Sequence, residues 1–108
     1  MMYYTFTVDN KDYKLRLTTR QVVNLEKQLG CNPISIFGSG DRIPTVTEMV
    51  TILHNSLVEL NHSINLNEAY AIFDKYLEEG NTSIDFIPII LEIYKASGII
   101  KTEEEQKN

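Results

Sequence analysis

The sequence contains one cysteine, no long apolar run and no cluster of basic residues. Because Cys31 has no second cysteine to pair with and no signal peptide is recognisable, we expect a reducing, cytoplasmic compartment. No apolar run approaches the length of a membrane span, so no membrane contact is expected. Lysine and arginine are scattered singly in a chain of net charge −5, which disfavours nucleic-acid binding because the phosphates would be repelled.

Motifs for catalysis or metal binding are also lacking. His54 and His62 are eight residues apart, whereas helical metal-binding histidines are usually three or four apart. Gly38-x-Gly40 has no third glycine and no preceding strand, so it predicts a flexible loop rather than a phosphate-binding one. Cys31 has no basic neighbour in the sequence and is interpreted as a packing residue. We therefore expect no cofactor, no metal and no enzymatic activity. An enzyme whose site assembles from distant residues remains an alternative.

The N-terminal residues alternate between apolar and polar side chains. Tyr3 to Val8 and Tyr13 to Leu17 both follow this period of two, and the polar residues 9–12 separate them. The pattern predicts an antiparallel β-hairpin with a four-residue turn. One face of the hairpin should be apolar and must be covered by helices, because a lone hairpin is only marginally stable.

Helix start and stop signals divide the next part of the chain. Thr18 followed by Gln21 has the spacing of a capping box, and Gly30 is suited to a left-handed C-terminal cap. Asn32-Pro33 then predicts the start of a short helical turn that contains Ile34, Ile36 and Phe37.

The segment from Thr45 to Asn61 is the predicted central helix. Thr45 and Glu48 form a capping-box pair at its start. Apolar residues then recur at steps of three and four, which predicts one stripe facing the core. The predicted stripe consists of Val46, Met49, Val50, Leu53, Leu57 and Leu60.

Two further helices are predicted after residue 64. Asn65 with Glu68 should cap the first, whose broad apolar face contains Leu66, Ala69, Tyr70, Ile72, Phe73, Tyr76 and Leu77 and which Gly80 should end. Ser83 or Asp85 should cap the second, which Gly98 should end. Tyr70, Tyr76 and Tyr94 fit core packing, although their amphipathic rings also suit a protein interface.

Together these signals predict an α+β fold that is predominantly helical, with the N-terminal antiparallel hairpin packed on four main helices and one short helix. We expect a single globular domain over residues 1–100, with the hairpin at 3–17 and the helical part at 18–100. Residues 101–108 are charged and predict a disordered tail.

Several segments resemble one family of proteins when they are taken in order. They are Y-K-L-R-L-T-T-R-Q-V-V-N-L-E-K-Q-L-G at 13–30, N-P-I-S-I-F at 32–37, P-T-V-T-E-M-V-T-I-L-H-N-S-L at 44–57, E-E-G at 78–80 and I-I-L-E-I-Y-K-A-S-G at 89–98. The chain resembles the tail assembly chaperones of long-tailed bacteriophages and prophages of Gram-positive bacteria, in their short form.

The resemblance implies a non-enzymatic protein of the host cytoplasm that is not part of the mature virion. Its implied partner is the tape measure protein, which such chaperones coat and keep soluble during tail assembly. A frameshifted longer form would recruit the tail tube protein, and Gln106-Lys107-Asn108 is compatible with an adenine-rich slippage site. Self-association into a homo-oligomer would multiply weak contacts through effective concentration.

Apolar residues outside the main stripes are the candidate partner-binding residues. They are Ile34, Ile36 and Phe37 beside the predicted loop, and Ile99 and Ile100 beyond the last helix. Burial in the core is the alternative for each of them. A small phage or bacterial adaptor that binds a host protein is the alternative function, since it would also lack catalytic residues.

Overall fold

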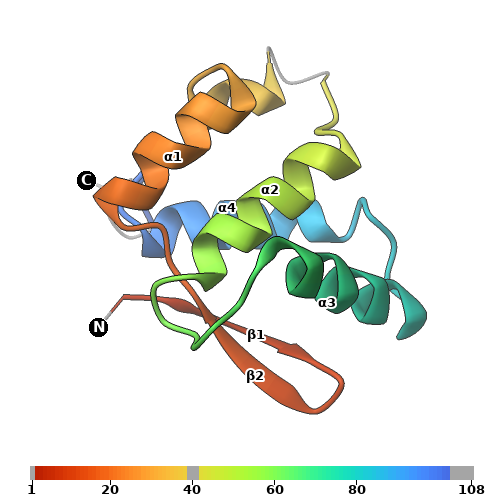
Figure 1. Cartoon of the computed structure of the whole chain (residues 1–108). Helices are drawn as coiled ribbons and strands as arrows, with labels where there is room; N and C mark the ends of the chain where they lie inside the picture. Colours follow the sequence, from red (N-terminus) through yellow and green to blue (C-terminus); the bar gives the residue numbers. More distant parts are fainter. Residues whose placement is uncertain (1, 39–41, 103–108) are drawn as a thin grey trace.

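The computed structural model describes residues 2–38 and 42–102. It confirms the predicted α+β class: a two-stranded antiparallel hairpin is followed by one 3₁₀ turn and four helices (Figure 1). The predicted loop at 38–42 and tail at 101–108 fall partly outside the described residues. The elements are β1 (Tyr4–Val8), β2 (Lys11–Leu15), α1 (Thr19–Leu29), η1 (Pro33–Phe37), α2 (Val46–Leu57), α3 (Leu66–Glu78) and α4 (Phe86–Ala96).

The hairpin has a two-residue turn, which is tighter than the predicted four-residue turn. Asp9 and Asn10 have φ angles of 55° and 60°, as a type I′ turn requires, so β2 begins directly at Lys11. In the resulting register Tyr4 is opposite Leu15 and Phe6 is opposite Tyr13. The predicted apolar face is confirmed: its central residues are buried, and Tyr4 and Tyr13 are half-buried at its margin.

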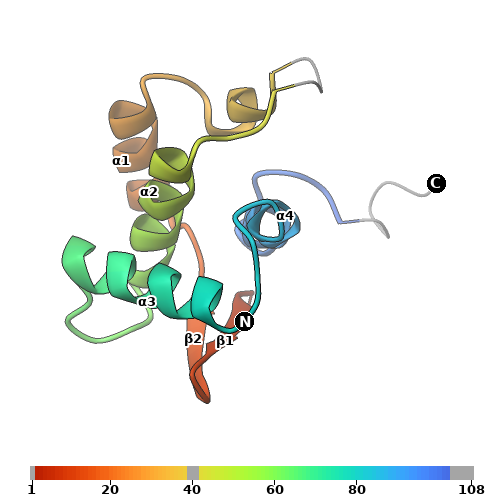
Figure 2. The same cartoon turned by 90° about the vertical axis from the view of Figure 1, so that its right-hand side faces the viewer.

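Helix α2 is the central helix, as predicted. It contacts α1, α3, α4 and β2, and Figures 1 and 2 show it between α1 and α3 with α4 on another side. The capping box of Thr45 and Glu48 is formed. The helix ends at Leu57 rather than at Asn61, and Asn61 closes this end by donating to the Leu57 carbonyl oxygen from both its backbone and its side-chain amide.

The predicted apolar stripe of α2 needs two corrections. Val46 is exposed because it lies in the first turn, where no other element covers it, and Leu60 lies beyond the helix and is only half-buried. The buried face also includes polar residues: Asn55 donates from its amide to Gln28 of α1 at 2.7 Å. Buried polar groups of this kind require a partner, and here the partner fixes α1 against α2.

Four aromatic rings join the hairpin to the last two helices. Phe6 of β1, Phe73 and Tyr76 of α3, and Phe86 of α4 make five ring contacts, with centroids 5.3 to 6.0 Å apart. All five pairs are edge-to-face or tilted, which is the arrangement that aromatic quadrupoles favour. The apolar face of β1 is therefore covered by α3 and α4.

Helix α4 begins differently from the prediction. Asp85, one of the two predicted caps, occupies the N-cap position, but its side chain makes no capping hydrogen bond to the helix. Instead Thr82 and Asp85 bind each other reciprocally, with the Asp85 carboxylate accepting from the Thr82 amide at 2.8 Å. This arrangement stabilises a short turn that leads into the helix. The predicted end at Gly98 is confirmed: its φ angle is 78°, and the Ile99 amide donates to the Tyr94 carbonyl oxygen as in a Schellman motif.

Candidate partner-binding surface

The structure separates the candidate residues of η1 by their exposure. Asn32 and Pro33 start this turn as predicted, with the Asn32 side chain accepting from the amide of Ile34. Ile34 is 45% exposed and is available to a partner. Ile36 is completely buried in the core, so its predicted role in partner binding is not supported by this conformation.

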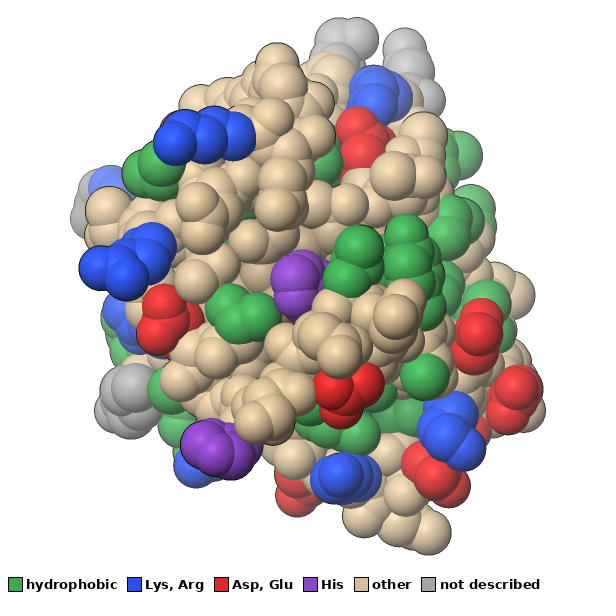
Figure 3. All heavy atoms as spheres, in the orientation of Figure 1, with side chains coloured by type: hydrophobic (Ala, Val, Ile, Leu, Met, Phe, Trp, Pro, Cys, Tyr) green, Lys and Arg blue, Asp and Glu red, His purple; other side chains and the backbone are tan. Residues whose placement is uncertain are grey.

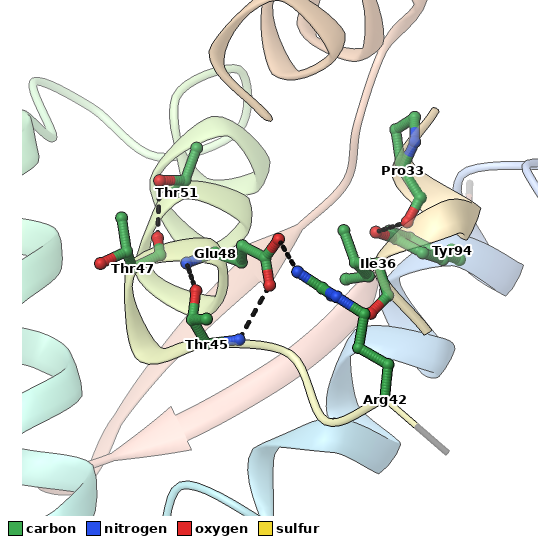
Figure 4. Close-up of polar contacts among 8 residues, drawn as sticks. All are labelled: Pro33, Ile36, Arg42, Thr45, Thr47, Glu48, Thr51 and Tyr94. Atoms are coloured by element: carbon green, nitrogen blue, oxygen red, sulfur yellow. Dashed lines mark hydrogen bonds and ion pairs between the residues drawn. The ribbon is translucent and has the colours of Figure 1, made fainter. Parts of the chain in front are cut away.

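Phe37 is half-buried and packs against the core. Its ring lies edge-on to that of Tyr94 in α4, with the centroids 6.3 Å apart. The Tyr94 hydroxyl in turn donates to the carbonyl oxygen of Pro33 at 3.0 Å (Figure 4). Burial raises the pKa of Tyr94, so this hydroxyl remains a donor at physiological pH. Tyr94 therefore fixes both ends of η1 to α4.

Ile99 and Ile100 follow α4 and are also half-buried against the core. The Schellman bond from the Ile99 amide turns the chain back at this point, which brings both side chains toward the domain. Each therefore presents only part of its apolar surface to solvent.

A polar latch lies between η1 and α2. The guanidinium of Arg42 donates to the carbonyl oxygen of Ile36 and to the carboxylate of Glu48, the latter at 2.7 Å (Figure 4). The second carboxylate oxygen of Glu48 accepts from the Thr45 amide at 2.8 Å. Partial burial would raise the pKa of Glu48, but the hydrogen bonds from Arg42 and Thr45 outweigh it and hold that pKa below its ordinary value.

Helix α3 exposes apolar residues that the sequence pattern assigned to the core. Leu66, Tyr70 and Leu77 lie at one edge of its apolar face, and Tyr70 is 50% exposed. We call these three residues the α3 stripe. The core interpretation of Tyr70 is therefore wrong, whereas that of Tyr76 and Tyr94 is confirmed.

The width of the predicted face could have revealed the α3 stripe. Its seven residues span roughly 160° around the helix at 100° per residue, whereas a core-facing stripe need be only about 100° wide. The neighbouring helices and the hairpin bury Ala69, Ile72, Phe73 and Tyr76. The remaining edge stays at the surface, next to the exposed carboxylates of Asp74 and Glu78.

Exposed apolar side chains also occur at the start of α2. Ile43, just after the latch, is 58% exposed, and Val46 follows it in the first helical turn. Figure 3 shows one face of the molecule, on which hydrophobic side chains reach the surface mainly in the right half and acidic side chains lie among them. On this side of the molecule separate apolar side chains lie among charged side chains of both signs.

A small cavity of about 270 Å³ lies between the hairpin and α3. It is lined by Asp9, Lys11, Tyr13, Ile64, Glu68, Ala71, Ile72 and Lys75. Lys75 is 3.5 Å from the Asp9 carboxylate, and two lysines face two carboxylates around the opening. Because the opposite charges compensate each other, the cavity has no preference for an anion or a cation.

The residues weighed as catalytic or metal-binding candidates are not brought together. Cys31 is exposed, and partial burial lowers the pKa of His54 on α2. Within residues 2–38 and 42–102, no three histidine, cysteine, aspartate or glutamate side chains are grouped so that they could hold a metal ion. In the same residues no helix is long and apolar enough to span a membrane.

The fold and surface define a small, helix-dominated α+β domain with several exposed apolar side chains. The chain belongs to DUF6096, a family of unknown function, whose model matches residues 3–108. No curated protein and no solved structure matches the chain.

Proposed function

We propose that this chain is a non-enzymatic tail assembly chaperone that binds the phage tape measure protein and keeps it soluble. The proposal starts from the resemblance of the segments between residues 13 and 98 to the short form of such chaperones. It would act in the cytoplasm of the bacterial host and would be absent from the mature virion. A frameshifted longer form would bring in the tail tube protein.

The α3 stripe is the observation that carries this proposal. Leu66, Tyr70 and Leu77 follow one another at helical steps of four and seven, so they form a line along the helix. A line of this kind can receive one apolar face of a long helical partner. The α3 stripe leaves apolar area exposed on a folded domain, as a protein that shields another apolar surface must do.

Ile34 is a second contact candidate. It projects from η1, which Tyr94 and the latch hold against the rest of the domain. Phe37, Ile99 and Ile100 present only part of their surface, so they are proposed as secondary contacts. A partner that touches several such small areas would bind each weakly, and repetition along its length would supply the affinity.

Co-expression tests the proposal. The chain would be produced together with a phage tape measure protein, and the soluble fraction of that protein would be measured with and without the chain. We expect the soluble fraction to rise several-fold and the two proteins to co-purify. No change in solubility and no co-purification would refute the function. Capture of a host protein in their place would support the adaptor alternative.

Surface variants then locate the contact. Tyr70→Glu places a charge in the middle of the α3 stripe without removing a buried side chain, and should reduce the soluble fraction of the partner. Val23→Glu is the matched control, because Val23 is 42% exposed but lies on α1. If Tyr70→Glu behaves like Val23→Glu while the wild-type chain solubilises its partner, the chaperone function stands and the contact lies elsewhere, with Ile34→Glu as the next variant.

A further inference from the structure

The two outer edges of the hairpin differ in how their backbone groups are satisfied. On the β2 side, the Asn61 side chain accepts from the amide of Lys14 at 3.2 Å and donates to its carbonyl oxygen at 2.6 Å. The Asn61 amide thus takes the place of a neighbouring strand. Directly after β2, the backbone amide of Arg16 donates a hydrogen bond to the Ser56 carbonyl oxygen at 2.9 Å, so this part of the edge is also satisfied.

Along Thr5 and Thr7 the β1 edge has no such cover in the described part of the chain, whereas directly after the strand the Asp9 amide donates to the Glu79 carboxylate. In an antiparallel ladder the backbone groups of directly opposed residues point either both inward or both outward, and the direction alternates along the strand. The backbone N–H and C=O groups of Lys14 point outward, toward Asn61. Thr5 is opposite Lys14, so its backbone groups also point outward, and those of Thr7, two residues later, do the same. Within the part of the chain that the structure describes, no group covers the outward N–H and C=O groups of Thr5 and Thr7.

The sequence of β1 does nothing to prevent pairing at this edge. Exposed edge strands are usually protected by lysine, proline, a bulge or a covering segment. β1 reads Y-T-F-T-V, without a charge or a proline, and its register with β2 is unbroken over all five residues. Figure 2 shows β1 on the side of the hairpin away from the loop that carries Asn61, with the helices above the hairpin rather than beside this edge.

We propose that the β1 edge pairs with the β1 edge of a second copy of this chain, which joins the two hairpins into one four-stranded antiparallel sheet. A two-fold axis at Phe6 would place Thr5 opposite Thr7 of the second copy, and Thr7 opposite Thr5 of the second copy. All four outward N–H groups would then find a carbonyl oxygen. The proposal is independent of the tape-measure function, because it needs no other partner.

The composition of β1 favours a second copy as the occupant. The strand contains no ionisable side chain apart from the tyrosine hydroxyl, so two identical strands can meet without opposing like charges. Elsewhere on the surface the net charge of −5 makes two copies repel each other. The arrangement also pairs threonine with threonine across the new strand boundary, which is a favourable cross-strand combination. Such a contact is isologous and closes at the dimer.

Sedimentation of matched variants tests the pairing. Thr5→Pro removes the outward N–H group but leaves the ladder with β2 intact, since proline is tolerated on an edge. Thr5→Val keeps this N–H group and a similar side-chain shape. We expect dimers for the wild type and for Thr5→Val, and a dissociation constant roughly ten- to a hundredfold weaker for Thr5→Pro, because each dimer loses two amide donors. A wild type that stays monomeric at high concentration would overturn the proposal, as would equally tight dimers of all three proteins.

Hydrogen exchange of the wild type gives a second readout that does not depend on any variant folding. In the dimer the amides of Thr5 and Thr7 should be protected, and their protection should increase with protein concentration. The Lys14 amide, which is already bound to Asn61, is the internal reference and should not change. Fast exchange of Thr5 and Thr7 in a dimeric sample would show that another surface mediates association and would contradict the pairing.

Discussion

The hydroxyl of Tyr94, in α4, donates a hydrogen bond to the carbonyl oxygen of Pro33, in η1, at 3.0 Å. Tyr94 is completely buried, and the bond connects two segments that are 61 residues apart. The short 3₁₀ turn has few backbone hydrogen bonds of its own, so this contact and the Arg42 latch hold it in place. The position of Ile34 on the surface depends on both.

Tyr94→Phe should destabilise the domain by about 0.5–1.5 kcal/mol, because it removes the buried hydrogen bond from the Tyr94 hydroxyl to the Pro33 carbonyl oxygen. The free energy of unfolding from urea titration measures this effect. Tyr70→Phe is the control: its hydroxyl is on a half-exposed ring, so stability should change little. Equal effects of the two variants would mean that the bond to Pro33 makes no net contribution.

Phe86→Ala should be the most damaging single change among the aromatic residues. Its ring contacts those of Phe6, Phe73 and Tyr76, and large-to-small changes of buried phenylalanine cost about 3–5 kcal/mol. A domain of this size is typically stable by only about 5–15 kcal/mol, so the loss is a large share of the total and the variant should unfold at a clearly lower temperature. Thermal unfolding followed by circular dichroism checks this, with the exposed Ile84→Ala as control. A melting temperature near that of the wild type would contradict the central place of this ring.

Because of Glu48, the free energy of unfolding of the domain should depend on pH in the acidic range. Its pKa is lower in the folded chain than in the unfolded one, so its contribution is fully present above the unfolded pKa, near 4.5, and is lost as the pH falls through the lower folded value. Glu48→Gln should lose about 0.5–2 kcal/mol of stability at neutral pH, as for other helix caps. The difference from the wild type should shrink below pH 4.

Unfolding titrations between pH 3 and 7 measure this dependence. Glu92→Gln serves as the control, because Glu92 forms an exposed pair with Lys95 within α4 and caps no helix. A Glu48→Gln variant that differs from the wild type by the same amount at every pH would show that the carboxylate contributes through shape rather than charge.

Asn61→Ala should uncover the second edge of the hairpin. It removes both bonds to Lys14 and a bond to the Leu57 carbonyl oxygen, and we expect a loss of about 1–2 kcal/mol. With both edges open, copies could add on either side, so light scattering should reveal species larger than a dimer. The glutamine side chain of Asn61→Gln is too long to make both bonds to Lys14, so this variant should also form species larger than a dimer. The nearby surface change His62→Gln is the control and should not.

Local signals predicted the helix starts well. Thr45 with Glu48, Asn65 with Glu68, and Asn32-Pro33 each act within four residues, so the sequence alone contains the whole interaction. Thr82 with Asp85 has the same spacing, but the predicted cap is Ser83 or Asp85, and the structure shows the Thr82–Asp85 pair in the turn before the helix. The ambiguity comes from three polar residues, Thr82, Ser83 and Asp85, within one turn.

Burial was predicted less well, because it depends on which elements meet. The pattern places Ile36 on a short turn and Tyr70 on a helix, yet the first is in the core and the second is at the surface. Only the packing of η1 against α1 and α4, and the limited cover over α3, distinguishes them. The role of Asn61 likewise needs Lys14 beside it, a contact between residues 47 positions apart.

The contact between Phe6 and Phe86 has a consequence for synthesis. Phe6 is synthesised 80 residues before Phe86, whose ring covers it in the folded domain. A hairpin without this cover is marginal on its own. The core therefore stays incomplete until α4 has been made, and the domain should fold in one step once α4 is available rather than progressively from the hairpin.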